Sequence, residues 1–325
     1  MTEALLEIRN LHTYFRTDEG LAKAVNGVDL IVPKGQTLGL VGESGCGKSV
    51  TALSIMRLIP DPPGRIVGGE IIFEGRDLIK LTEPQMRTVR GNTIAMIFQE
   101  PMTALNPVYK IGSQMAEVIQ LHQKVGKTAA MDRVLEMLNK VGIADAKRRL
   151  NEYPHEISGG MRQRVLIAMA LSSHPKLVIA DEPTTALDVT IQAQILDLIN
   201  TLKDEMGTSN LLITHDLGVI SEMAQWVAVM YAGKVVEYAS AEELFDRPLH
   251  PYTVGLMESI PHIDQPVSPD KMLKTIPGMV PSLFEVLEGC SFQDRCNHVF
   301  DRCRREEPHL VDVDSGHLVR CWLHE

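Results

Sequence analysis

Residues 42–49, Gly-Glu-Ser-Gly-Cys-Gly-Lys-Ser, form the segment of this sequence with the clearest chemical meaning. They match the phosphate-binding pattern G-x-x-x-x-G-K-[ST] at every fixed position. The glycines let such a loop curve closely, so that backbone N–H groups and a helix N-terminus converge on anionic oxygens. The lysine brings a positive charge to the β- and γ-phosphates, and the final serine offers its hydroxyl to Mg²⁺. The pattern predicts a nucleotide site made by Gly42, Ser44, Gly45, Cys46, Gly47, Lys48 and Ser49.

The residues on either side of this loop favour the same interpretation. Residues 37–41 are an apolar run of strand length, and residues 50–56 suit a helix. The loop therefore joins a strand to a helix, which is the context that the pattern requires. Cys46 lies in the loop, where the start of a helix favours a lowered thiol pKa. Two expectations follow for Cys46: a reactive thiol whose alkylation blocks nucleotide binding, or simply a small tolerated residue.

A pair of acids, Asp181 and Glu182, follows the apolar run 177–180. A carboxylate at the end of a buried strand is costly unless it holds a cation or a water molecule. We predict that Asp181 helps to bind Mg²⁺ from the second coordination shell and that Glu182 polarises an attacking water. The alternative is two solvated acids that begin a loop.

The elements that must position these residues alternate between strand and helix patterns. Apolar residues recur at three- and four-residue steps between about 111 and 150, which predicts helices, and another helix is expected near 190–204. Strands are expected at 5–8, 28–32, 68–75, 94–99, 177–180 and 211–214, with a strand pair at 226–238. This alternation predicts an α/β fold with a mainly parallel sheet and helices on its faces.

The length and the charge of the chain exclude some classes of function. A chain of 325 residues suffices for one large or two modest domains. The formal net charge of −10 argues against a protein that coats nucleic acid. The N-terminal residues contain no basic region followed by an apolar core, and we find no apolar run of about 18 residues. We therefore expect any membrane role to depend on partners.

The composition changes after about residue 245, where prolines become frequent and periodicity fades. This predicts a loop-rich appendix, for which a metal centre would be a source of stability. Four cysteines lie there, separated by five, six and seventeen residues: Cys290, Cys296, Cys303 and Cys321. Zinc fingers favour closer pairs, whereas an iron–sulfur cluster accepts wider spacing. The alternatives to a cluster are zinc and free or redox-active thiols.

These motifs resemble those of the ATPase subunits of ABC transporters, over roughly residues 5–245. The signature Leu-Ser-Gly-Gly-Gln of that family occurs here as Ile-Ser-Gly-Gly-Met at 157–161, where Met161 departs from the usual glutamine. The resemblance implies an ABC ATPase domain over 1–245: a P-loop NTPase core with an antiparallel β subdomain and a helical subdomain at about 100–165. It also implies that Ser158 and Gly160 offer donors to the γ-phosphate of an ATP held by an opposite subunit.

The same resemblance implies roles for four more residues. Gln99 corresponds to the Q-loop glutamine, which senses Mg²⁺ and water and relays closure to the permease. Asp188, in the segment Ala186-Leu187-Asp188, corresponds to the D-loop, and His215 to the switch histidine that contacts the γ-phosphate. Phe15 occupies the place of the aromatic residue that stacks on adenine, and Tyr14 is its rival.

The segment 246–325 resembles the C-terminal extension of oligopeptide and dipeptide importer ATPases. The runs His-Pro-Tyr-Thr at 250–253 and His-Leu-Val-Arg-Cys-Trp at 317–322 carry this resemblance. In that family such cysteines are associated with a 4Fe–4S cluster, so the resemblance implies a cluster held by the four C-terminal cysteines. We expect its role to be structural rather than redox.

The resemblance implies an ATP-hydrolysing, Mg²⁺-dependent subunit that energises the import of di- or oligopeptides. The implied partners are a second, related ATPase chain, two permease subunits and an extracytoplasmic substrate-binding protein, which would place the chain peripherally at the cytoplasmic face of the membrane. Import of nickel, glutathione or glycans is the alternative for the same scaffold. A non-transport ABC protein acting on DNA or the ribosome is less consistent with the acidic charge. Intact Lys48, Asp181, Glu182 and His215 argue against a module without catalysis.

Overall fold

The computed structural model describes residues 3–185, 187–259, 275–284 and 288–325. The chain forms two compact units, and each unit combines segments that are distant in sequence. The first unit contains the described residues up to Leu5, then Val32–Thr37 and Asp77–Ile213. The second contains Leu6–Ile31, Leu38–Arg76 and Thr214–Glu325. Each unit is described below by itself.

The first unit is built on three neighbouring parallel strands, in the order β8 (Ser209–Ile213), β7 (Leu177–Asp181) and β6 (Ile94–Ile97). Every residue of β7 and β8 is buried. A parallel strand that is covered on both faces needs apolar side chains on both, which explains the apolar runs at 177–180 and 211–213. The predicted strands in these three places are confirmed.

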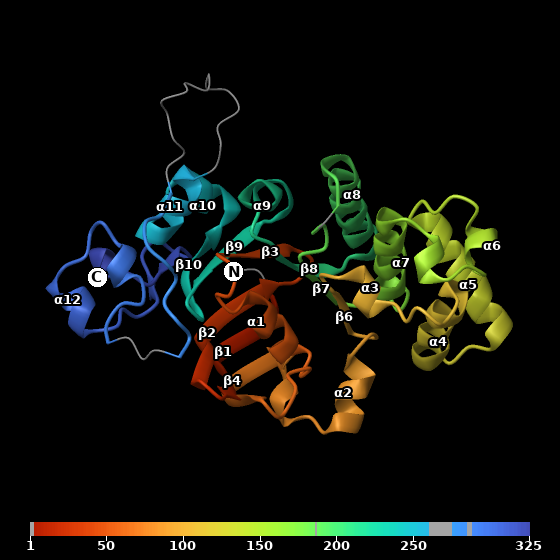
Figure 1. Cartoon of the computed structure of the whole chain (residues 1–325), viewed down its shortest axis with the longest axis horizontal. Helices are drawn as coiled ribbons and strands as arrows, with labels where there is room; N and C mark the ends of the chain where they lie inside the picture. Colours follow the sequence, from red (N-terminus) through yellow and green to blue (C-terminus); the bar gives the residue numbers. More distant parts are fainter. Residues whose placement is uncertain (1–2, 186, 260–274, 285–287) are drawn as a thin grey trace, which may run out of the picture. The chain divides into compact units, whose positions relative to one another are not determined.

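Helix α7 lies next to β6, and helices α4, α5 and α6 form a group on the other side of α7 (Figure 1). The long helical region that we predicted is present, but it is divided into separate helices. Lys124 adopts a left-handed conformation at the end of α4, and Gly142 follows α5 with a φ of 72°. The helices are α2 (Glu83–Val89), α3 (Pro101–Ala104), α4 (Ile111–Gln123), α5 (Lys127–Lys140), α6 (Ala146–Arg149), α7 (Gly159–Leu171) and α8 (Val189–Met206). Among the described residues, no helix combines the length and the apolar character needed to cross a bilayer.

The second unit contains two groups of β-strands. One antiparallel sheet has the order β2 (Gly20–Pro33), β1 (Ala4–Thr17), β4 (Gly64–Phe73) and β5 (Arg76–Asp77). A second group of strands has the order β11 (Val311–Asp312), β12 (Leu318–Val319), β10 (Lys234–Ser240), β9 (Trp226–Tyr231) and β3 (Thr37–Val41). Within this group β3 and β9 run parallel, and the other neighbours run antiparallel. Helices α1 (Lys48–Ile55) and α9 (Leu217–Met223) complete the unit before its C-terminal part.

The C-terminal part has more regular structure than its composition predicts. It contains α10 (Ala241–Asp246), α11 (Pro251–Glu258) and α12 (Asp301–Arg305). Its strand β12 extends the sheet by pairing with β10, so that Val319 lies opposite Glu237. Phe292 and Trp322 are also buried. The expectation of a loop-rich appendix therefore holds for its connections but not for its packing.

A buried hydrogen bond links this part to β10. The Nε2 atom of His317 lies 2.8 Å from Oε1 of Glu237, and both side chains are fully buried. The carboxylate also accepts hydrogen bonds from the backbone N–H groups of Leu249 and His250. Burial alone would raise the pKa of Glu237, but hydrogen bonds, above all that of His317, outweigh it and lower this pKa. The hydrogen bond between His317 and Glu237 holds the C-terminal segment on the sheet.

Folding stability should depend on pH through His250, which is 1 % exposed. This residue is the N-cap of α11, where its side chain accepts a hydrogen bond from the N–H of Tyr252. Burial lowers its pKa from 6.5 to about 4. The unfolded chain therefore binds one more proton than the folded chain between these values, so the free energy of unfolding should fall as pH drops from 6.5 to 4. The loss should be at most about 3 kcal/mol, measured by urea unfolding at a series of pH values.

The variant His250→Asn isolates this effect, because asparagine can accept the same capping hydrogen bond without titrating. We expect a flatter pH dependence in His250→Asn and an unchanged one in His309→Asn, since His309 is exposed. An equal slope in His250→Asn and the wild type would contradict the assignment.

Candidate functional site

The predicted phosphate loop lies between the end of β3 and the start of α1. Gly42, Gly45 and Gly47 all have positive φ values, of 149°, 81° and 105°. A Cβ atom on Gly42 would lie 2.2 Å from the carbonyl oxygen of Met230, and one on Gly47 would lie 2.3 Å from that of Ala24. Glycine is therefore required at these two positions by space as well as by conformation.

Lys48 is the first residue of α1, and its side chain turns into the loop. The residue is 5 % exposed, and its Nζ donates hydrogen bonds to the carbonyl oxygens of Gly42 at 2.7 Å and Glu43 at 3.0 Å. Ser44 and Gly45 form the exposed apex, and Ser49 is half-buried in the first turn of the helix. A buried ammonium group and the N-terminus of a helix thus meet at the same loop, which is the arrangement that binds phosphate.

The structure contradicts the expectation of a reactive thiol at Cys46. This residue is fully buried, and burial raises the pKa of its thiol, although Lys48 acts in the opposite direction. A protonated and inaccessible thiol is a poor nucleophile. The interpretation of Cys46 as a small tolerated residue agrees with the structure.

In the first unit, Asp181 and Glu182 lie where β7 ends. Asp181 is the last residue of the strand and is 5 % exposed. Glu182 has a φ of 45°, in the left-handed region that few residues other than glycine adopt. Its backbone N–H donates to the carbonyl oxygen of Ile213 at 2.9 Å, which ties this conformation to the end of β8. The strained backbone holds the Glu182 side chain at the carboxyl edge of the strands.

The carboxylate of Glu182 is oriented by two side chains. Its Oε2 atom accepts hydrogen bonds from Nε2 of Gln99 at 3.0 Å and from Oγ1 of Thr185 at 2.9 Å. The structure thus brings together two residues that were predicted separately, Gln99 and Glu182. The sequence analysis missed Thr185. Its position in a turn, three residues after Glu182, could have indicated it, because hydroxyl side chains in turns often bond to groups nearby in the chain.

Two other predicted residues begin helices in the same unit. Ser158 is the N-cap of α7, where its hydroxyl accepts from the N–H of Met161, and Asp188 is the N-cap of α8, where its carboxylate accepts from the N–H of Ile191. A Cβ atom on Gly160 would lie 2.9 Å from Cγ2 of Ile191, so the glycine allows the first turns of these two helices to approach closely. The predicted D-loop is described only in part, because Ala186 lies outside the described residues.

The remaining predicted residues belong to the second unit. His215 is exposed and immediately precedes the N-cap of α9. Phe15 is half-buried on β1. Its ring packs against Gly64, where an added Cβ atom would lie 2.5 Å from Cε1 of Phe15. The hydroxyl of its rival, Tyr14, donates to the side-chain oxygen of Asn26 at 2.8 Å.

The predicted 4Fe–4S cluster is wrong. Among the residues that the structure describes, no three His, Cys, Asp or Glu side chains are arranged to hold a metal ion, which also argues against zinc. Burial, the largest cause, raises the pKa of both the Cys290 and the Cys321 thiol to about 11. The four cysteines border one small cavity and are free: Cys290, Cys296, Cys303 and Cys321. The alternative of free thiols agrees with these observations.

The source of stability in the C-terminal part also differs from the one that we expected. Strand pairing, the buried hydrogen bond between His317 and Glu237, and the burial of large aromatic rings hold this segment in place. These contacts provide the folding stability that we expected from a metal centre.

The close backbone contact at Gly47 yields a stability prediction. Gly47→Ala should lower the free energy of unfolding by at least about 2 kcal/mol more than Gly45→Ala, because overpacking against a backbone carbonyl adds to the strain of a positive φ. Gly45 is the matched control, since it also has a positive φ but no neighbouring atom lies within 4 Å of the Cβ that alanine would add. Urea unfolding measures the difference, and equal losses in the two variants would contradict it.

Family comparisons agree with the geometry of both units. Residues 25–185 match the family model described as ABC transporter, and residues 236–303 match the one described as oligopeptide/dipeptide transporter, C-terminal region. The chain is 57 % identical to the probable peptide ABC transporter ATP-binding protein y4tR of Sinorhizobium fredii, over 98 % of this chain and 95 % of that protein. It is 53 % identical to the oligopeptide transport ATP-binding protein AppD of Bacillus subtilis, over 99 % of this chain and 97 % of that protein.

A solved structure shares the fold. The dimeric ATP-binding cassette MJ0796, bound to ADP and phosphate in a post-hydrolysis state, superposes with a TM-score of 0.65 at 25 % identity. The superposition covers 73 % of this chain and 98 % of that one. The chain belongs to the ATP-binding proteins of the ABC transporter family, in the group that carries the oligopeptide/dipeptide transporter C-terminal region.

Proposed function

We propose that this chain is the ATP-hydrolysing subunit that energises a peptide importer. The observation that carries the proposal is the Glu182 carboxylate, which is held by Gln99 and Thr185 at the end of a buried strand. Its relatives are named as peptide and oligopeptide transport ATP-binding proteins. These names support a peptide cargo over nickel, glutathione or glycans, which remain the alternatives for this scaffold.

In this proposal the loop 42–49 binds the β- and γ-phosphates of ATP. The backbone N–H groups, the start of α1 and the ammonium group of Lys48 supply the positive potential. Lys48 would exchange its hydrogen bonds to the loop carbonyls for bonds to phosphate oxygens. Ser49 and Gln99 would hold Mg²⁺, with Asp181 acting from the second coordination shell, and the bound ion would offset the negative charge that develops on the phosphate oxygens.

Glu182 takes the role of the group that activates water. Its carboxylate accepts a proton as the water oxygen bonds to the γ-phosphorus and the bond from that phosphorus to ADP breaks. The hydrogen bonds that Gln99 and Thr185 donate to Oε2 would fix the direction in which the carboxylate meets the water. His215 is proposed to contact the γ-phosphate, and Phe15 to stack on the adenine ring.

Two ATPase subunits would act together. In this part of the proposal, Ser158, Gly160 and Asp188 face a nucleotide held by the partner ATPase, which we propose to be a related but different chain. The dimeric state of MJ0796 supports such pairing. The other proposed partners are two permease subunits and an extracytoplasmic binding protein, with this chain at the cytoplasmic face. We also propose that the ATPase domain ends near residue 245 and the C-terminal extension follows.

Transport in the source organism tests the cargo. Deleting the gene for this chain should abolish uptake of labelled di- and tripeptides, because the permeases lose their source of energy, and an intact copy should restore it. Uptake of labelled nickel and glutathione serves as the control. Peptide uptake that persists while one of these control cargoes is lost would contradict the peptide assignment.

Glu182→Gln should lower ATP turnover at least ~10²-fold, because the amide keeps the shape of the side chain but does not accept the proton. The variant should still bind MgATP. Phosphate release and nucleotide retention, measured on the assembled transporter, check both expectations.

Glu205→Gln is the matched control, since it makes the same chemical change on the surface of α8, where Glu205 pairs with Lys140. Its turnover should equal that of the wild type. Unchanged turnover in Glu182→Gln would refute the role given to this carboxylate.

A further inference from the structure

An arginine of the C-terminal part contacts the phosphate loop. Nη1 of Arg295 lies 2.7 Å from Oε2 of Glu43, and Nη2 lies 2.9 Å from Oε1, so the guanidinium holds the carboxylate with two parallel hydrogen bonds. The Arg295 side chain is 5 % exposed and that of Glu43 is 29 % exposed. Such bidentate pairs combine strength with a fixed geometry. The contact joins two residues that lie 252 positions apart in the sequence.

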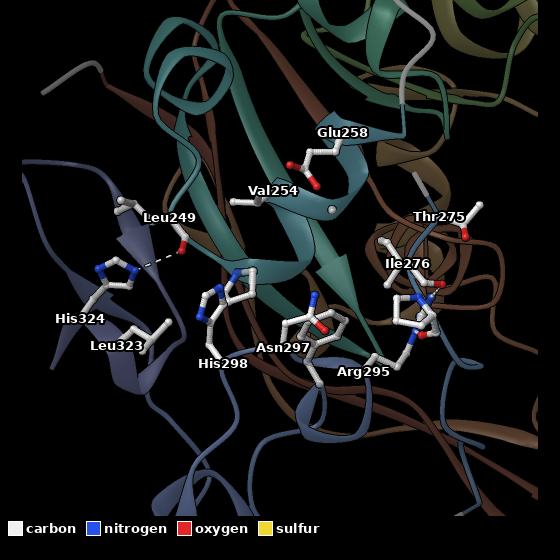
Figure 2. Close-up of a pocket in the computed structure, with 14 residues that line it drawn as sticks. Leu249, Val254, Glu258, Thr275, Ile276, Arg295, Asn297, His298, Leu323 and His324 are labelled. Carbon is white, nitrogen blue, oxygen red and sulfur yellow. Dashed lines mark hydrogen bonds between the residues drawn. The ribbon is translucent and has the colours of Figure 1, made fainter. Parts of the chain in front are cut away.

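Arg295 is itself held firmly. Its Nε donates to the carbonyl oxygen of Pro277 at 2.9 Å, and its guanidinium lies over the rings of Tyr231 and Phe292. The hydrogen bond with Glu43 is the largest cause of a raised pKa for this guanidinium, which therefore stays charged. Figure 2 shows Arg295 beside Ile276, in the wall of a cavity of about 440 Å³. The arginine is thus a fixed cation of the C-terminal part rather than a mobile surface side chain.

A second contact reaches the same loop residue. The backbone N–H of Glu43 donates to the hydroxyl of Tyr252 at 2.9 Å, and Tyr252 is fully buried on α11. The ring of Tyr252 packs against those of Tyr231 and Phe292, which also contact Arg295. The main chain and the side chain of Glu43 are therefore both held by the part of the molecule that follows the ATPase motifs.

The charge of Glu43 explains why this contact matters. The carboxylate belongs to a loop that must bind a highly charged anion. Without a counter-ion, a carboxylate in this loop would repel the phosphates. Arg295 neutralises it and holds it in one direction. Lys48 bonds to the carbonyl oxygen of the same residue, so a movement of Glu43 would also disturb the lysine.

We infer that Arg295 is a positioning residue for nucleotide binding, through which the C-terminal segment sets the affinity of the phosphate loop. Arg295 neutralises Glu43 and fixes the start of the loop. This inference rests on the proposed function only in taking ATP as the ligand of the loop. It assigns to the C-terminal segment a function in the ATPase site that needs no metal.

The inference predicts a rescue. Arg295→Gln should weaken the binding of a fluorescent ATP analogue with Mg²⁺ about tenfold and raise the KM for ATP similarly, with a smaller change in kcat, because the released Glu43 carboxylate repels the phosphates. Adding Glu43→Gln to this variant should restore most of the affinity, because it removes that charge. Arg305→Gln is the matched control, since Arg305 is an exposed arginine of the same segment, and it should bind like the wild type.

The outcomes separate this inference from the proposed function. Equal affinity in Arg295→Gln and the wild type would overturn the inference, and so would a double variant as weak as Arg295→Gln alone, because Arg295 would then act through packing. A wild-type protein that binds no ATP would instead contradict the proposed function. Thermal unfolding of each variant shows whether weak binding reflects lost folding. The variant Arg295→Lys keeps the positive charge but loses the paired hydrogen bonds, so it should bind with intermediate affinity.

Discussion

The phosphate loop depends on two places where the main chain approaches another strand too closely for any side chain. The carbonyl of Met230 on β9 faces Gly42, and the carbonyl of Ala24 on β2 faces Gly47. These contacts fix both ends of the loop, and with them the direction of α1 and the depth of Lys48. Phosphate binding therefore depends on the packing of strands far from the motif in sequence, as well as on the motif itself. A small shift of either strand would change the curvature of the loop and therefore the direction of its backbone N–H groups.

Local patterns allowed much of the site to be predicted. The strand, loop and helix around 42–49, and the acids at the end of β7, are encoded within short runs whose pattern can be recognised without knowledge of the tertiary structure. The hydrogen bond between Gln99 and Glu182 joins residues 83 positions apart, and neither local pattern predicted it. The contact between Glu43 and Arg295 was not foreseen, because no periodicity links a loop residue to an arginine so far along the chain. Charge pairs of this kind emerge only when the fold brings the segments together.

The C-terminal part shows where reasoning from composition failed. Many prolines and fading periodicity suggested loops too poor in apolar contacts to stay folded alone. The structure instead stabilises them by pairing β12 with β10, by the buried hydrogen bond between His317 and Glu237, and by packing the rings of Tyr252 and Phe292. Short strands and isolated aromatic residues leave little periodic signal, although each buries substantial area. Cysteine spacing was then interpreted as a metal centre that the fold does not require.

At Glu182 a strained backbone carries the carboxylate to which we assign a role in catalysis. A φ of 45° costs a residue with a Cβ atom about 1 kcal/mol or more, whereas glycine would adopt it freely. Glycine at this place would thus favour the folded state, yet it would remove the carboxylate that Gln99 and Thr185 orient. Natural selection for folding alone would discard the glutamate. The catalytic role that we propose for its carboxylate would explain why a glutamate occupies this unfavourable conformation, at a cost in stability that the rest of the domain tolerates.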